Sequence, residues 1–220
     1  MAQKLGLQHA SIRAAYDIAC EAYAAKFIDE LDHKPLDREL LKHFSTLVEP
    51  DRTVLDIGCG PGHTTAYLTL LGVSATGVDL SPKMIELASK AFPQTNFAVG
   101  NLFALDYPSS SIEGVLALYC IVHLSPDQLL GAFSEMFRVL RNGGVLLLSF
   151  HVGSGTVRAD NFLETGATLD FAFFDPEEVR TALLAAGFHS IEMQIREPYE
   201  KEYPSQRCYV FARKPQCDLS

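Results

Sequence analysis

Cysteine is sparse in this sequence, and both long apolar runs and clusters of basic residues are missing. The five cysteines are scattered and form no CxxC pair, which argues against a disulfide framework and against a zinc site. The longest apolar runs are roughly half of the ~18 residues that span a membrane, and the N-terminus lacks the apolar core of a secretory signal. These absences predict reduced thiols, no bound metal, no membrane partner and a cytoplasmic location. The cysteines are Cys20, Cys59, Cys120, Cys208 and Cys217.

Basic residues are outnumbered by acidic ones. Lys and Arg number 18 against 27 Asp and Glu, which gives a formal net charge of −9 at pH 7. No local cluster of Lys or Arg offsets this balance, so nucleic acid is not expected as a partner. Enzymes that act on amino groups of DNA, and many that act on RNA or protein, carry an Asn/Asp-Pro-Pro-aromatic turn that binds a planar amine after the fourth strand. Here the end of the fourth expected strand reads ALYCIV, so this turn is missing. We therefore expect a small-molecule partner and a protein that is a monomer or a homodimer.

The chain alternates between helical and strand patterns after an N-terminal helical segment. Helices are expected from about residue 11 to 48, and the first three strand candidates are almost continuously apolar, as strands buried on both faces are. Strand and helix follow one another in regular alternation, which predicts a parallel sheet. The expected strands are 52–58, 74–80, 95–101, 112–122 and 144–151, and the helices between them are 62–72, 81–92 and 125–144.

Two more strands are expected at 190–198 and 206–214, after a helix at 175–188. The segment between them is too short for a helix, so they should pair antiparallel at one edge. The predicted fold class is α/β: a doubly wound, Rossmann-like, seven-stranded sheet, mostly parallel with an antiparallel last strand, with N-terminal helices as a partial lid. We expect a single domain over 1–220, composed of a helical cover (1–48), a cofactor-binding core (49–151) and a C-terminal helix with a β-hairpin (152–220).

The stretch VLDIGCGPGHTT, residues 54–65, contains three glycines where a helix follows a strand. Gly58, Gly60 and Gly62 occupy the place where open α/β sheets bind nucleotides. Asp79 ends the next predicted strand about twenty positions further on, the spacing of an acid that accepts both ribose hydroxyls. The pattern predicts the adenosine half of a cofactor.

The details of the turn distinguish between cofactors. A dinucleotide turn, GxGxxG, would place its third glycine at His63, and no Gly-Lys-Ser/Thr of a P-loop occurs. Asp56 would repel a pyrophosphate but can help to hold an ammonium group. We therefore expect a nucleoside that carries an amino acid through an uncharged linker. An NAD(P)-dependent oxidoreductase remains an alternative, against which His63 and the lack of a Tyr-xxx-Lys pair argue.

Three stretches, VLDIGCGPG, ATGVDLSPKMIELA and HLSPDQLLGAFSEMFRVLRNGGVLLLS, resemble the class I S-adenosylmethionine-dependent methyltransferases, in particular the small-molecule, ubiquinone/menaquinone-type group. The resemblance covers about residues 15–150 by motif. It implies an enzyme that transfers the methyl group of S-adenosylmethionine to oxygen, nitrogen or carbon of a small organic acceptor and releases S-adenosylhomocysteine. A non-catalytic protein that binds the same cofactor remains an alternative.

The resemblance also implies which residues contact the cofactor. Asp56 and the three glycines of the turn would line the methionine and ribose parts of the cofactor. Leu80 and Met84 would lie against its adenine. An acid usually receives the adenine amine, but here Asn101 and Leu102 stand at that position, so the amide oxygen would accept without charge assistance. The expected cofactor contacts are Asp56, Gly58, Cys59, Gly60, Gly62, Asp79, Leu80, Met84, Asn101, Leu102, Leu118 and Tyr23.

Candidate catalytic residues follow the fourth and fifth strands or lie in the N-terminal helix. His151 is the best base candidate, although a structural histidine explains it equally well. Tyr119 can face the pocket, whereas His123 in the same loop is interpreted as a packing or capping residue. Tyr16 and Tyr23 share a helix face, and they either fold over the cofactor, as YD..A..Y segments do in the resembled family, or pack in the core. The candidate catalytic residues are thus His151, Tyr119 and Tyr16.

Two arginines near the C-terminus leave the charge of the acceptor open. Arg196 and Arg207 would favour an anionic acceptor if they reached the pocket, because guanidinium groups pair with carboxylates in bidentate fashion. The alternative is a solvated surface on which they balance Glu197, Glu200 and Glu202.

Overall fold

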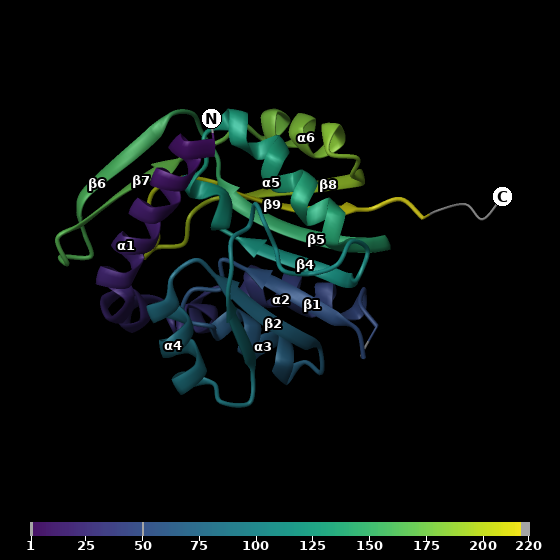
Figure 1. Cartoon of the computed structure of the whole chain (residues 1–220), viewed down its shortest axis with the longest axis horizontal. Coiled ribbons are helices and arrows are strands. Elements are labelled where there is room, and N and C mark those ends of the chain that lie inside the picture. The colour runs from purple at the N-terminus through teal and green to yellow at the C-terminus, as the bar shows by residue number, and fades with distance from the viewer. Residues whose placement is uncertain (1, 50, 217–220) are drawn as a thin grey trace.

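The computed structural model describes residues 2–49 and 51–216, with the backbone alone for residues 2–5. A seven-stranded sheet in the order β3-β2-β1-β4-β5-β9-β8 forms its centre (Figure 1). All neighbouring strands are parallel except β9, which runs antiparallel to both β5 and β8. The predicted fold class is confirmed. The strands are β1 (Thr53–Ile57), β2 (Ser74–Asp79), β3 (Asn96–Val99), β4 (Ile112–Leu118), β5 (Leu140–His151), β8 (His189–Arg196) and β9 (Arg207–Arg213).

Helices cover both faces of this sheet, each through its own hydrophobic core. One core joins α5 and α6 to one face through Phe133, Met136 and Leu183. The other joins α2 and α3 to the opposite face through Phe44 and Leu68. The helices are α1 (Ala2–Phe27), α2 (Pro35–Thr46), α3 (His63–Leu70), α4 (Pro82–Ala91), α5 (Pro126–Val139) and α6 (Pro176–Ala185), with short 3-10 helices at Glu30–His33 and Cys120–His123.

Two elements differ from those expected. β3 was expected to be buried on both faces, but it lies at one edge of the sheet and its Asn96 and Val99 are exposed. An apolar pattern in the sequence does not distinguish an edge strand from a central one. The helix expected up to residue 144 ends at Val139, since Leu140 already pairs with Ile112 across a register shift. The two glycines at 143 and 144 therefore lie inside β5 instead of ending the helix.

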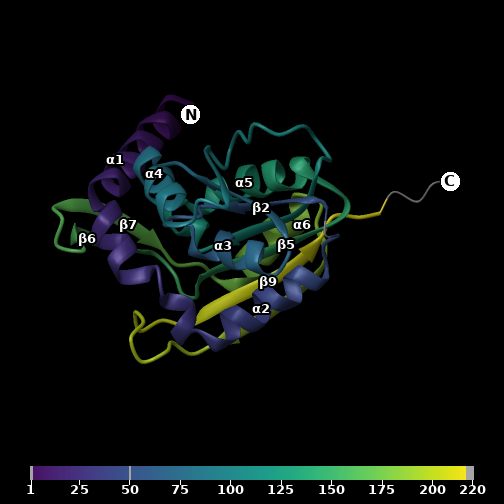
Figure 2. The same ribbon diagram turned by 90° about the horizontal axis from the view of Figure 1, so that it is seen from below.

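A β-hairpin that the sequence did not predict follows β5. Strands β6 (Thr156–Phe162) and β7 (Ala167–Ala172) form a separate two-stranded antiparallel sheet. Its Ala167 and Leu169 pack against Ala15 and Ala19 of α1, and Ala172 at the end of β7 joins the core on the main sheet. Figures 1 and 2 both show the hairpin beside α1, which itself begins at Ala2 and not near residue 11.

The helix α1 is fixed to the start of α4 by one carboxylate. Asp17 accepts a hydrogen bond from the Ser81 hydroxyl at 2.5 Å and one from the Lys83 amide at 3.3 Å. The same Ser81 oxygen accepts from the Met84 amide and caps α4. These contacts place α1 beside α4 at the carboxyl ends of the strands (Figure 2).

The described residues show neither a metal cluster nor a membrane span. Within 2–49 and 51–216, no group of His, Cys, Asp and Glu could hold a metal ion, and no helix combines the length and apolar character of a membrane span. Cys20, Cys59, Cys120 and Cys208 are free thiols, and Cys217 lies outside the described residues.

Two glycines with the same backbone angle provide a test of packing at the start of α3. Gly62 has φ +87°, and a Cβ there would lie 2.6 Å from the Phe97 ring and 2.8 Å from Ala88. Gly72 has φ +86° but nothing within 4 Å of that position. A left-handed alanine costs about 1–2 kcal/mol at either site, and overpacking adds about 1–3 kcal/mol at Gly62 alone.

We therefore expect Gly62→Ala to lower the midpoint of thermal unfolding by several degrees more than Gly72→Ala does. Calorimetry or circular dichroism on the two variants measures this difference. An equal loss of stability in both would contradict the described packing of Gly62.

Candidate functional site

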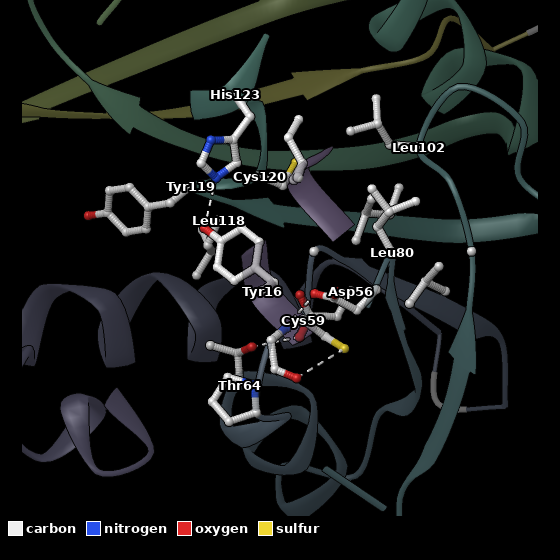
Figure 3. Close-up of a pocket in the computed structure, with 18 of the residues that line it drawn as sticks. Tyr16, Asp56, Cys59, Thr64, Leu80, Leu102, Leu118, Tyr119, Cys120 and His123 are labelled. Atoms are coloured by element: carbon white, nitrogen blue, oxygen red, sulfur yellow. Dashed lines mark hydrogen bonds between the residues drawn. The ribbon is translucent and has the colours of Figure 1, made fainter. Parts of the chain in front are cut away.

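A pocket opens at the carboxyl ends of β1, β2 and β4 (Figure 3). Its floor is the glycine turn, in which Gly58 and Gly60 have φ +73° and +52°. A Cβ on Gly58 would lie 2.6 Å from the Cβ of Cys120, so the turn lies directly against the loop that follows β4. Only glycine allows this approach at position 58, and the amides of Gly58 and Cys59 donate to the Val78 carbonyl, which ties the turn to β2.

Asp79 ends β2 and faces the same pocket. Its Oδ2 accepts from the Gly60 amide at 2.9 Å and its Oδ1 from the Ser81 amide at 2.8 Å. Protein surrounds the carboxyl group, which remains partly accessible only through the pocket, and this burial raises its pKa to about 6. Each carboxylate oxygen accepts more than one hydrogen bond, so Asp79 has acceptor capacity left for a ligand with neighbouring hydroxyls.

Asp56 lies deeper, in β1, and is almost completely buried. The hydroxyls of Thr64 and Thr65 each donate to its Oδ2 at 2.6 Å. Burial raises the pKa of Asp56, and these two hydrogen bonds oppose the rise. The contacts tie β1 to the first turn of α3 and keep a carboxylate at the bottom of the pocket.

The helix α1 forms the opposite wall. His9, Ile12, Tyr16 and Tyr23 all line the pocket, and their spacing of three, four and seven places them on one helix face. The rings of Tyr16 and Tyr23 meet edge to face with centroids 5.7 Å apart. Both tyrosines line the pocket, and Tyr16 also packs against the hydrophobic cluster between α1 and β7.

Tyr16 and His123 form a hydrogen-bonded pair on the pocket wall (Figure 3). His123 Nδ1 lies 2.8 Å from the backbone carbonyl of Asp170, which can only accept, so Nδ1 carries the proton. Burial lowers the pKa of His123 and favours the neutral ring, whose Nε2 then accepts from the Tyr16 hydroxyl at 2.7 Å. His123 thus packs in the loop as expected, and in addition it presents a basic nitrogen to a tyrosine in the pocket.

Comparison with known proteins assigns the part of the chain that forms the pocket floor. Residues 54–144 match the family model described as a methyltransferase domain. This segment is a methyltransferase domain. The structure of a DhpI–SAH complex has the same fold: it aligns with a TM-score of 0.71 at 21% identity and covers 94% of this chain and 97% of that one.

Two curated relatives show how far the similarity extends. The 2-methyl-6-phytyl-1,4-hydroquinone methyltransferase of Synechocystis sp. is 34% identical over 104 residues, 46% of this chain and 32% of that protein. The malonyl-[acyl-carrier protein] O-methyltransferase of Yersinia pestis is 29% identical over 147 residues, 66% of this chain and 52% of that protein. The matched segments span between about a third and a half of the length of these relatives.

Most of the residues predicted for the site of the methyltransferase domain lie together in the pocket. Gly62 and Met84 are not among the lining residues: Gly62 caps α3 and packs against Phe97, and Met84 is buried within α4. The predicted residues that line the pocket are Asp56, Gly58, Cys59, Gly60, Asp79, Leu80, Asn101, Leu102, Leu118, Tyr16, Tyr23 and Tyr119.

Sequence reasoning did not propose several other lining residues. His9 belongs to the same helix face as Tyr16, so its spacing alone could have indicated it. Glu30 and His63 meet across the pocket wall with 3.0 Å between Oε1 and Nε2, a contact over 33 positions that no local pattern indicates.

His151 lies outside the lining, behind Tyr119. Its ring centroid is 5.3 Å from that of Tyr119, and its Nδ1 lies 2.9 Å from the Ser205 hydroxyl. Burial lowers the pKa of His151 to about 4, and the charges of Arg207 and Lys34 add to the effect. His151 therefore packs on a pocket residue and is absent from the lining of this pocket, and its lowered pKa favours the neutral ring.

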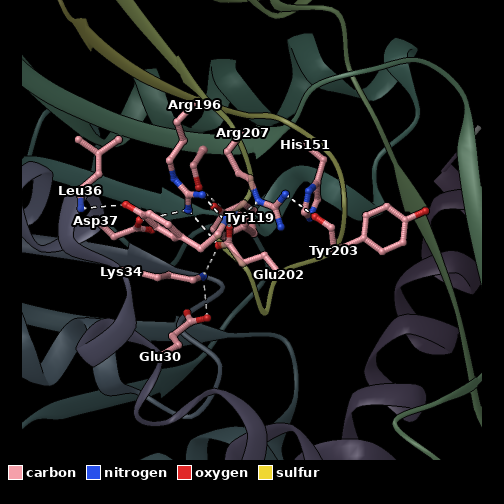
Figure 4. A network of polar contacts seen from close by, with 12 residues as sticks. Glu30, Lys34, Leu36, Asp37, Tyr119, His151, Arg196, Glu202, Tyr203 and Arg207 are labelled. Atoms are coloured by element: carbon pink, nitrogen blue, oxygen red, sulfur yellow. Dashed lines mark hydrogen bonds and ion pairs between the residues drawn. The ribbon is translucent and has the colours of Figure 1, made fainter.

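A largely buried ionic cluster joins the N-terminal helices to the segment between β8 and β9 (Figure 4). Arg196 makes two contacts with Glu202, at 2.6 and 2.9 Å, and lies 3.4 Å from Asp37. Lys34 lies between Glu30 and Glu202, at 2.8 and 3.4 Å, and above the ring of Tyr119. The cluster contains Lys34, Arg196 and Arg207 together with Glu30, Asp37 and Glu202.

The three cations of this cluster are matched by three carboxylates. Arg196 and Arg207 are therefore neither part of a solvated surface nor free to pair with an anionic acceptor, which were the two alternatives open from the sequence. Of the three acids expected to pair with these arginines, Glu202 does so. Asp37 of α2 is a further partner of Arg196, which the sequence did not indicate because the two residues lie far apart in the chain.

Proposed function

We propose that the pocket binds S-adenosylmethionine and that the protein transfers its methyl group to oxygen, nitrogen or carbon of a small organic acceptor. The observation that supports this most strongly is the carboxylate of Asp79, which faces the pocket while it accepts a hydrogen bond from the amide of Gly60 in the glycine turn. A ribose with two neighbouring hydroxyls is the ligand part that matches such an acceptor.

The remaining lining fits the other parts of the cofactor. Leu80, Asn101 and Leu102 offer an apolar slot with one amide for the adenine. Asp56 and Asp79 line the pocket without a cationic partner of their own among the described residues, whereas Glu30 is paired with Lys34. The field of the two aspartates favours a sulfonium and an ammonium group over the pyrophosphate of a dinucleotide. This charge pattern supports S-adenosylmethionine over NAD(P).

The residues of the chain supply what methyl transfer still requires. When bound, the cofactor would supply an electrophilic methyl group on a sulfonium and a neutral thioether as the leaving group, so the protein has to orient the acceptor and remove its proton. We assign the removal of this proton to Tyr16 and His123. The acceptor proton passes to the Tyr16 oxygen while the Tyr16 proton moves to Nε2 of His123. Tyr119 forms the neighbouring wall, and His151 supports that wall from behind.

The proposed cellular location and the proposed kind of partner follow from the net charge and from the thiols. The free thiols of the described cysteines fit a reducing cytoplasm, and the net charge of −9 disfavours a nucleic-acid partner. A small-molecule acceptor is in keeping with the hydroquinone methyltransferase among the relatives.

Calorimetric titration with S-adenosylhomocysteine and with NADH tests the cofactor. We expect micromolar binding of the former and none of the latter. Asp79→Ala should weaken the binding of S-adenosylhomocysteine at least tenfold, because hydrogen bonds to a charged group are lost. Asp106→Ala, an exposed aspartate outside the pocket lining, is the matched control and should bind as the wild type does. Binding of NADH in place of S-adenosylhomocysteine would favour the oxidoreductase.

Tyr16→Phe tests the proton pathway, because it keeps the ring and removes the hydroxyl. With an acceptor identified by a labelled methyl donor, we expect kcat to fall about a hundredfold while the Kd for S-adenosylhomocysteine changes less than twofold. Tyr67→Phe, in α3 and outside the pocket lining, is the control. An unchanged kcat would remove Tyr16 from the pathway, and cofactor binding without turnover of any acceptor would favour the non-catalytic alternative.

A further inference from the structure

Asn101 occupies the pocket position at which an acid is usual, and two neighbours fix its side chain. Its Oδ1 accepts a hydrogen bond from the Phe103 amide at 3.0 Å. Its Nδ2 lies 3.0 Å from Nδ1 of His9, which comes from α1. Both Asn101 and His9 line the pocket. The amide therefore lies between its own loop and the N-terminal helix.

The donors in this series of hydrogen bonds determine which ring nitrogen of His9 carries the proton. A backbone N–H must meet an oxygen, so the other end of the Asn101 amide is its NH2 group, which can only donate. His9 Nδ1 is then the acceptor, and the ring proton lies on Nε2. Burial lowers the pKa of His9, which favours this neutral ring, and the ring stacks on Phe103 with centroids 5.2 Å apart.

After these two contacts the Asn101 amide keeps one lone pair on oxygen and one N–H. An amide that offers an acceptor and a donor side by side is complementary to adenine, whose 6-amino group donates next to a ring nitrogen that accepts. A 6-oxopurine has the reverse pattern, with an accepting oxygen beside a ring N–H. The remaining groups of Asn101 therefore match a 6-aminopurine.

We propose that His9 is a positioning residue that, together with the Phe103 amide, holds the Asn101 amide in this orientation, so that Asn101 recognises the adenine of the cofactor in bidentate fashion. The inference rests on the proposed function, because it assigns the adenine end of the same site. A carboxylate at this position needs no such device, since its two oxygens are equivalent. An amide needs one, because a flip would turn its NH2 group toward both the Phe103 amide and the adenine amine.

The position of His9 gives the recognition a second consequence. Because His9 belongs to α1, one hydrogen bond connects the helix that forms the pocket wall to the residue that would recognise adenine.

A cycle of variants tests this role by calorimetry with S-adenosylhomocysteine and its 6-oxopurine analogue. His9→Phe keeps a ring to stack on Phe103 and removes the Nδ1 acceptor. We expect it to weaken the binding of S-adenosylhomocysteine about five- to tenfold, the effect of one lost hydrogen bond, and to reduce discrimination against the analogue. In an Asn101→Asp background, in which no amide has to be oriented, His9→Phe should change the affinity less than twofold.

The design separates this inference from the function on which it rests. If His9→Phe weakens binding equally in both backgrounds, His9 acts by packing α1 and the positioning role is overturned, although cofactor binding stands. If the wild-type protein binds no S-adenosylhomocysteine, the proposed function fails and this inference fails with it. Circular dichroism of each variant confirms that the compared proteins are folded.

Discussion

The enclosed carboxylate of Asp79 is the constraint on which the pocket depends. Burial disfavours its charge, and two backbone amides oppose that effect, one from the glycine turn and one from Ser81. Ser81 in turn caps α4 and donates to Asp17 of α1. One side chain at the end of β2 thus connects the glycine turn, the start of α4 and the N-terminal helix, and these are the surfaces between which a nucleoside would lie.

Segments from both ends of the chain complete the enclosure. Tyr16 of α1 contacts His123 after β4, and His123 contacts the backbone of β7, so one histidine links the helix to the unpredicted hairpin in addition to their direct packing. On the other side, Lys34 links Glu30 of the pocket wall to Glu202. A buried ionic cluster with matched charges is costly to break, which makes it suited to fixing the N-terminal segment in one place.

The sequence was sufficient for the parts of this structure that depend on local chemistry. The glycine turn, Asp79 and the alternation of strands and helices predicted the sheet and most of the pocket floor. The hairpin was missed because its apolar residues, such as Leu169, pack on α1, and strand patterns are usually interpreted against the main sheet. The contacts of His123 with Tyr16 and of Arg196 with Asp37 were missed because these partners lie more than a hundred residues away in the chain.

The most direct measurement of the central claim is the titration of the Asp79 carboxyl group by nuclear magnetic resonance, in the free protein and with S-adenosylhomocysteine. We predict a pKa near 6 in the free protein, raised from 3.8 by burial, and a fall on binding, because ribose hydroxyls donate to the ionised form. By linkage, S-adenosylhomocysteine should then bind more weakly as the pH falls through 6, where Asp79 takes up its proton. A pKa near 3.8 that does not change with the ligand would contradict the account.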